Sequence, residues 1–251
     1  MELVNILGVN VSPVPFTGVL EMIESWIEAG TKKYICCTPV SSVMAAHDDK
    51  KVMDAINGAG LAVPDGMPIV WIVQLAGFPN QDRVYGPDLL TSVCGLSEKK
   101  GYSHFFYGGQ PGIPERLVGN LKHQFPCLKV AGTYCPPFRP LTAEEDSGII
   151  DEINRNSPDI VWVGLGSPKQ DLWMSEHYQK LDAKVCIGIG AAFDFHAGRV
   201  KQAPRWMQRS GLEWVYRLWQ EPTRLWRRYL VGNPMFVFFL ILQLLRIRKY
   251  E

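Results

Sequence analysis

An acid and a hydroxyl each follow a short apolar run, and both could take part in catalysis. Asp65 comes after Leu61–Val63, and Thr38 comes after Tyr34–Cys37. A carboxylate at the end of a strand can accept a proton from a hydroxyl nucleophile, as a general base does. Asp65 could also be the N-cap of the next helix, because Asp is a preferred residue there. Both interpretations stay open, and one residue can have both roles.

Three further turns combine glycine with polar side chains. They contain Gly108 and Gly109, then Gly164, Gly166 and Gln170, and finally Gly190 and Asp194. Glycine lets the backbone approach a ligand closely, and the N-terminus of a following helix attracts phosphate. Any one of these turns by itself is more often only a tight turn. Taken together, they predict a nucleotide-type cleft in which Gln170, in the first turn of a helix, can hydrogen-bond a ligand.

The sequence lacks the common motifs of metal and nucleotide sites. It contains no DxD, no HExxH and no P-loop, and Lys169 occupies the third-glycine position of a GxGxxG pattern. We therefore expect no metal ion and no cofactor. If a nucleotide diphosphate leaves, backbone N–H groups and arginines would have to meet its charge.

Alternating strands and helices must position these residues. The apolar runs predict strands at Leu3–Val11, Tyr34–Cys37, Leu61–Val63, His104–Tyr107, Lys129–Tyr134, Ile160–Leu165 and Val185–Ile189. Helical spacing predicts helices at Phe16–Ala29, Ser42–Asn57 (in two pieces), Met67–Ala76, Pro87–Lys100, Pro111–Gln124, Thr142–Asn154 and Pro168–Lys180. This order indicates an α/β fold, a Rossmann-like and largely parallel sheet with helices on both faces. Ligands of such sheets bind at the carboxyl ends of the strands.

The pattern changes after Phe195, so we predict a catalytic domain over 1–195 and a helical appendage, rich in Trp and Arg, over 196–251. Residues 199–251 carry a formal charge of +8, and residues 1–198 carry −7. A basic tail on an acidic body suggests an anionic partner, which could be nucleic acid, phospholipid or a diphosphate. A solvated basic face is the alternative.

Arginines of the appendage fall on one side of its helices. Arg217, Arg224 and Arg228 are spaced i, i+7 and i+11, which places them on one helix face. Pro222 suits the first turn of a new helix, so the segment 211–230 should form two helices at an angle.

The last apolar run, Met235–Leu245, is the membrane candidate. Its eleven residues are too few to span a bilayer, which needs about 20. Arg246, Arg248 and Lys249 follow it, as in an interfacial helix on anionic lipid. A core helix is the competing interpretation.

The six cysteines (36, 37, 94, 127, 135 and 186) form no CxxC and are expected to be reduced core residues of a cytosolic protein. The N-terminal sequence has no basic segment followed by a long apolar one, so no secretion signal is expected.

Several longer motifs resemble those of the WecG/TagA/CpsF family of bacterial glycosyltransferases, over nearly the whole chain. The motifs are Pro64–Gly66, Arg83–Leu89, Gly108-Gly109 with Pro111-Gly112, Gly164–Gln170, Gly190–Phe195, Gly211–Leu218, and Glu221-Pro222 with Arg224. The resemblance implies an inverting, metal-independent transfer of an N-acetylmannosamine-type sugar. The donor would be a UDP-sugar and the acceptor an undecaprenyl-diphosphate-linked sugar, in cell-surface polysaccharide biosynthesis.

The resemblance also implies roles for particular residues. It makes Asp65 the general base with Thr38 beside it, has Arg83 and Gln170 line the pocket, and has the appendage close over the active site and meet the diphosphate through Arg217, Arg224 and Arg227. Many members have Asn where this chain has Val40, so one polar contact should be lost here. The appendage would contact the inner face of the cell membrane, with no nucleic acid as partner, and self-association as a homo-oligomer stays open.

Two other classes of function are alternatives. An NAD-dependent oxidoreductase would place its dinucleotide at Gly164–Gly166 and an acid about 20 residues on, where Asp182 is near the right distance. Lys169 breaks that pattern. A non-catalytic membrane adaptor would use the basic tail, but it leaves the glycine turns unexplained.

Overall fold

A computed structural model describes residues 2–250, and the chain forms two compact units. Unit 1 is Met1–Pro15, Cys37–Tyr85 and Gln202–Glu251, and unit 2 is Phe16–Cys36 and Gly86–Lys201. This grouping differs from a division between 195 and 196, because the appendage packs with two earlier segments of the chain.

Unit 2 is built on parallel strands. They are β3 (Lys33–Thr38), β5 (Ser103–Gly108), β6 (Lys129–Tyr134), β7 (Ile160–Gly164) and β8 (Val185–Gly188). Their registers are parallel throughout, and their order in the sheet is β3-β8-β7-β5-β6. The central strands are buried, so their sequences read as continuous apolar runs. The predicted parallel α/β sheet is confirmed.

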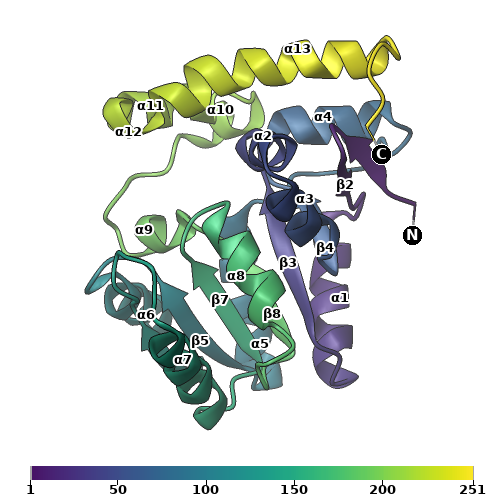
Figure 1. The fold of residues 1–251 in the computed structure, drawn as a ribbon. Helices are drawn as coiled ribbons and strands as arrows, with labels where there is room; N and C mark the ends of the chain where they lie inside the picture. The colour runs from purple at the N-terminus through teal and green to yellow at the C-terminus, as the bar shows by residue number, and fades with distance from the viewer. Residues whose placement is uncertain (1, 251) are drawn as a thin grey trace. The chain divides into compact units, whose positions relative to one another are not determined.

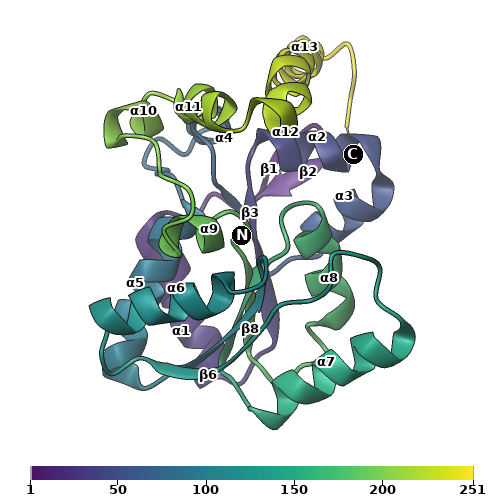
Figure 2. The same ribbon diagram turned by 90° about the vertical axis from the view of Figure 1, so that its left-hand side faces the viewer.

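Helices cover both faces of this sheet within unit 2. They are α1 (Phe16–Glu28), α5 (Gly86–Lys100), α6 (Ile113–Gln124), α7 (Ala143–Arg155), α8 (Lys169–His177) and α9 (Ala192–His196). Figure 2 shows α1, α5 and α6 on one side of the strands and α7 and α8 on the other. The start of α7 is fixed by a capping box. Thr142 Oγ1 accepts from the Glu145 N–H at 3.2 Å, and Glu145 Oε2 accepts from the Thr142 N–H at 2.9 Å.

Unit 1 combines a hairpin, one further strand and a group of helices. Its elements are β1 (Val4–Ile6), β2 (Val9–Val11), α2 (Val40–Asp48), α3 (Lys50–Asn57), β4 (Leu61–Pro64), α4 (Met67–Leu75), α10 (Arg205–Arg209), α11 (Glu213–Gln220), α12 (Pro222–Trp226), the π-helix η1 (Arg227–Val231) and α13 (Gly232–Leu244). The break between α2 and α3 confirms the prediction of two pieces. The break before Pro222 likewise confirms the predicted pair of helices.

The single strand predicted over Leu3–Val11 was wrong. Leu7 and Gly8 both have positive φ, at 52° and 92°, and they turn the chain into the antiparallel hairpin β1-β2. An apolar residue such as Leu7 rarely adopts this conformation, so the run gave no turn signal.

The helix α13 is packed on one side and exposed on the other. Phe239 stacks on His47 of α2 with ring centroids 4.4 Å apart, and Gln243 Nε2 donates to the Asn5 carbonyl at 3.0 Å. Phe236 is buried, and Figure 1 shows α13 crossing over α2. The outer side exposes apolar side chains at Leu230, Val231, Met235, Val237, Phe238, Ile241, Leu244 and Leu245.

The helical stretch is longer than the eleven residues considered from the sequence. It runs from Pro222 to Leu244, which is long and apolar enough to cross a membrane by length and composition, and 11% of its most apolar window is buried. The run Met235–Leu245 by itself is too short to span a bilayer, but the continuous helical stretch that contains most of it is not.

The cysteines form no disulfide among residues 2–250. Four of them, Cys36, Cys37, Cys94 and Cys186, are buried as expected. The prediction of core positions was wrong for Cys127, which is exposed, and for Cys135, which is half-buried.

Candidate active site

Asp65 lies in the turn between β4 and α4 in unit 1. The N-cap of α4 is Gly66, and no side chain caps the helix, so Asp65 is not the cap residue. Its N–H donates to the Thr38 carbonyl at 3.4 Å, which sets the two predicted catalytic residues side by side. The Thr38 side chain is fully buried, whereas the Asp65 side chain is 21% exposed. The Asp65 side chain is therefore accessible in part, although its Oδ1 is buried.

Arg83 is the cation that contacts Asp65. Its Nε donates to the Asp65 carbonyl, and its Nη2 lies 3.6 Å from Asp65 Oδ1. Its Nη1 is closer to Glu213 of α11, at 2.7 Å from Oε2. Burial lowers the pKa of Arg83, but the charges of Asp65 and Glu213 outweigh burial, and the pKa is raised above its ordinary value. Arg83 is therefore a fixed positive charge.

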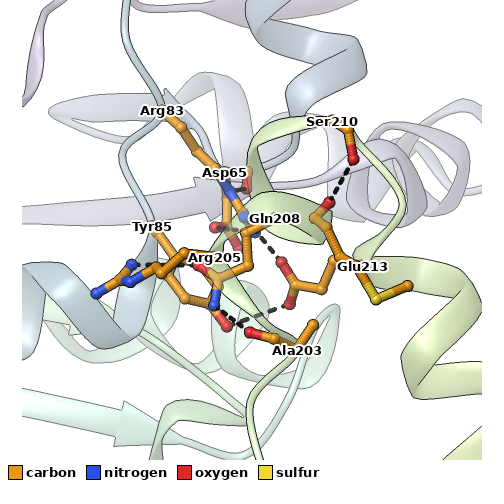
Figure 3. Close-up of polar contacts among 9 residues, drawn as sticks. Asp65, Arg83, Tyr85, Ala203, Arg205, Gln208, Ser210 and Glu213 are labelled. Carbon is orange, nitrogen blue, oxygen red and sulfur yellow. Dashed lines mark hydrogen bonds and ion pairs between the residues drawn. The ribbon is translucent and has the colours of Figure 1, made fainter.

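Tyr85 completes this network, as Figure 3 shows. Its hydroxyl donates to Glu213 Oε1 at 3.1 Å, and the Arg83 guanidinium lies 3.9 Å from the centre of its ring. Burial, and then the charge of Glu213, raise the pKa of Tyr85 far above its ordinary value, so the phenol stays protonated as a donor.

Arg228 of the appendage interacts electrostatically with Asp65. Its Nη2 donates to Ser41 Oγ of α2, and its Nε is buried with no hydrogen-bond partner. Burial lowers the pKa of Arg228, and the neighbouring charges of Arg217 and Arg224 lower it further, while Asp65 opposes them. An arginine already desolvated and crowded by like charge is a ready site for an anion.

Two further arginines of the appendage are exposed. Arg224 is exposed and pairs with Glu221 at 2.6 Å. Arg227 is exposed with its guanidinium 5.2 Å from the centre of the Trp226 ring. The one-face spacing of Arg217, Arg224 and Arg228 agrees with their mutual electrostatic interaction, and the roles implied for Arg217, Arg224 and Arg227 stay predictions.

Unit 2 brings the glycine turns together at the ends of β5 and β7. Gly108 is opposite Gly164 in the parallel register, and the Gly109 N–H donates to the Gly164 carbonyl at 3.1 Å. A Cβ added to Gly108, whose φ is 122°, would lie 2.6 Å from the Gly164 carbonyl carbon. Only glycine fits there, because backbone atoms cannot give way.

Gln170 is buried at the start of α8 and supports the second glycine turn. Its Oε1 accepts from the Gly166 N–H at 3.2 Å. The next residue, Asp171, is fully buried and accepts from the Ser167 hydroxyl at 2.5 Å. Burial raises the pKa of Asp171 to about 6, although hydrogen bonds from Ser167 and Cys36 oppose this. Gln170 thus supports the turn, and its contact with a ligand stays a prediction.

An open pocket of about 610 Å³ lies where β5 and β6 end, and Gly109, Gln110, Pro111, Gly112, Glu115 and Cys135–Phe138 line it. Its size falls within the range of small-molecule sites. Asp194 lies in α9 and pairs with Arg199 at 3.1 Å. No group of three or more His, Cys, Asp or Glu side chains that could share a metal ion occurs in the described part of the chain.

Unit 2 has a parallel α/β sheet with glycine turns at its strand ends, and unit 1 has a carboxylate beside guanidinium groups. Each of these features is typical of enzymes that act on phosphorylated substrates. Residues 4–250 match the glycosyl transferase WecG/TagA/CpsF family, and the chain belongs to that family. This membership also argues against the oxidoreductase and the adaptor.

Two curated relatives are each named N-acetylglucosaminyldiphosphoundecaprenol N-acetyl-beta-D-mannosaminyltransferase. The one from Bacillus subtilis (strain 168) is 30% identical over 226 residues, which is 90% of this chain and 85% of that protein. The one from Bacillus spizizenii (strain W23) is 34% identical over 175 residues, which is 70% of this chain and 66% of that protein.

Sequence reasoning missed four residues of the Asp65 network. Glu213 and Tyr85 lie inside motifs that were recognised, but nothing in their spacing pairs them with Arg83. Arg228 was placed on the correct helix face without being chosen for the site, and Ser41 carried no signal.

The close approach at Gly108 gives a test of the turn. We expect Gly108→Ala to destabilise the protein by more than about 3 kcal/mol, because the methyl group would meet backbone and the φ is unfavourable. The control is Gly119→Ala within α6, where nothing lies within 4 Å of the new Cβ. That change should stabilise by roughly 0.5–1 kcal/mol. Chemical denaturation measures both, and equal stability of the two variants would contradict the placement of Gly108.

Proposed function

We propose that the protein transfers an N-acetylmannosamine-type sugar from a UDP-sugar to an undecaprenyl-diphosphate-linked sugar. The observation that carries this proposal is the partly exposed Asp65 carboxylate, held at the end of β4 beside Arg83 and next to Thr38. Family membership supports the reaction class, and the names of the two relatives support the type of sugar and of acceptor.

The reaction is a single displacement. Asp65 takes the proton as the acceptor O–H bond breaks, and the freed oxygen forms the new bond to the anomeric carbon. The bond from that carbon to the UDP oxygen breaks at the same time, and UDP leaves with the electron pair. Displacement from the opposite face inverts the anomeric carbon. General-base help of this kind contributes typically about 10²–10⁴-fold.

Guanidinium groups stabilise the departing diphosphate. Arg228 fits this role, because it is desolvated and its Nε has no hydrogen-bond partner. Arg217, Arg224 and Arg227 remain candidates for the same diphosphate. The transfer takes place without a metal ion, since these cations can meet the charge that a divalent ion would otherwise meet.

The glycine turns of unit 2 are the proposed place of the nucleotide. Of Gly108, Gly109, Gly164 and Gly166, Gly109 lines the pocket of unit 2, and glycine lets the backbone approach a ligand closely there. Gln170 and Asp194 are the polar side chains of the same turns.

The protein works on the inner face of the cell membrane, with α13 lying on the surface rather than crossing it. Gln243, Phe239 and Phe236 bind the inner side of α13 to unit 1, so the helix cannot enter the bilayer without losing these contacts. The outer side is apolar, and the basic residues at 246, 248 and 249 follow it, as an interfacial helix requires.

The general base is tested by Asp65→Asn. We expect turnover of UDP-N-acetylmannosamine with a lipid-diphosphate-linked N-acetylglucosamine to fall by about 10²–10⁴-fold. UDP affinity, measured by calorimetry, should change less than about threefold. The control is Asp54→Asn, which removes an exposed carboxylate that pairs with Lys50 in α3 and should leave turnover unchanged. Full turnover by the Asp65 variant would remove this residue from the mechanism.

The membrane surface is tested by Phe238→Asp. Phe238 is 58% exposed on the outer side of α13. Burial of a phenylalanine contributes about 2 kcal/mol, so binding to phosphatidylglycerol vesicles should weaken about tenfold or more. Gln124→Glu adds a negative charge at an exposed position of α6 and should weaken binding far less. Equal weakening by both variants would show that only net charge matters.

A further inference from the structure

Glu213 and Asp65 share one guanidinium unequally. Arg83 Nη1 is 2.7 Å from Glu213 Oε2, a close ion pair, whereas Arg83 Nη2 is 3.6 Å from Asp65 Oδ1. The side chains of Arg83, Glu213 and Asp65 are 16%, 12% and 21% exposed, so water screens these charges only in part. Figure 3 shows Arg83 lying between the two acids.

Two contacts hold the Glu213 side chain in this position, at the start of α11. Its Oε2 forms an ion pair with Arg83, and its Oε1 accepts from the Tyr85 hydroxyl at 3.1 Å. The ring of Tyr85 also packs against Arg83, with the guanidinium 3.9 Å from the ring centre. The position of Arg83 is therefore fixed by a residue from the appendage and by Tyr85 together.

An arginine with no other carboxylate within reach would close on Asp65. It would form the short, charge-assisted pair that carboxylates and guanidinium groups prefer, and such a pair makes a carboxylate a weaker proton acceptor. Building on the proposed function, we propose that Glu213 is a positioning residue that holds Arg83 away from Asp65 and so keeps Asp65 able to take the acceptor's proton.

The charges around Asp65 explain why this matters. Arg83 faces it from the segment before α5, Arg228 faces it from η1, and the neutral phenol of Tyr85 lies beside Arg83. Glu213 is the acid from α11 that faces the same group. Arg217 and Arg224 add further positive charge near Arg228. Glu213 contributes a second negative charge beside Arg83. Without its charge, Asp65 would be one carboxylate facing Arg83 and Arg228.

The proposal also makes the base dependent on the appendage. Glu213 is supplied by α11, so Asp65 keeps its strength as a base only when α11 is in place. Loss of the appendage would then stop proton transfer itself, in addition to removing arginines that meet the diphosphate.

The first test is Glu213→Gln, which keeps the size of the side chain and an oxygen for the Tyr85 hydroxyl. We expect kcat at pH 7.5 to fall about 5- to 30-fold, while KM for the UDP-sugar changes less than about twofold. The acid limb of the kcat–pH profile should move to lower pH, because a weaker base loses its proton at lower pH. An unchanged acid limb would overturn the proposal.

A double-mutant cycle separates positioning from a merely structural role. In an Arg83→Gln background no guanidinium remains to be held, so Glu213→Gln should change kcat less than about twofold. If Glu213 only stabilised α11, its loss would cost the same in both backgrounds, and that result contradicts the proposal. Asp54→Asn is the control for a carboxylate lost elsewhere in unit 1, with no change in the profile expected.

Tyr85→Phe serves as a second variant should Glu213→Gln fail to fold. It removes one of the contacts that hold Glu213, and we expect a smaller shift of the acid limb in the same direction; no shift would count against the proposal. The Asp65→Asn result separates the two hypotheses. An active Asp65 variant refutes the proposed base, whereas an inactive one with an unshifted Glu213→Gln profile refutes only the role of Glu213.

Discussion

A single guanidinium held between two carboxylates determines how the candidate active site of unit 1 is built. Arg83 is bound tightly by Glu213 and loosely by Asp65, and Tyr85 supports both Arg83 and Glu213. A buried cation needs compensating charge, and two acids from distant parts of the sequence provide it. The acid held less tightly is the one with the chemistry to act as a base.

The appendage is therefore part of the site rather than an attachment to it. It supplies Glu213 from α11 and Arg228 from η1, and it is fixed to unit 1 through α13. The π-helix contributes directly, because an extra residue per turn changes the direction of successive side chains. Arg228 faces Ser41 and the Asp65 side, while its neighbour Arg227 stays exposed against Trp226.

Much of this arrangement could be predicted from the sequence, and the exceptions have physical reasons. Buried parallel strands read as apolar runs, and Thr142 with Glu145 signals a helix start, so these elements were found correctly. The hairpin at Leu7-Gly8 was missed because an apolar residue adopts positive φ there. Asp65 stood out because an acid at the end of a buried strand is rarely explained by packing.

Contacts between residues far apart in the chain could not be predicted from the sequence. Glu213 meets Arg83 across 130 positions of the chain, and neither residue carries a local pattern that names its partner. The grouping of residues 202–251 with the two segments near the N-terminus was hidden for the same reason. Composition showed that the appendage is basic and apolar, but it could not show which segments of the chain the appendage packs against.

The central claim is that the Glu213 charge keeps Arg83 from neutralising Asp65, and the protonation of Asp65 itself tests it most directly. Carbon-13 NMR of aspartate-labelled protein, assigned with the Asp65→Asn variant, follows the Asp65 carboxyl through a pH titration. The account predicts that Glu213→Gln lowers the pKa of Asp65 by about one unit or more, as expected when an arginine closes on a carboxylate. The same titration midpoint in both proteins would contradict it.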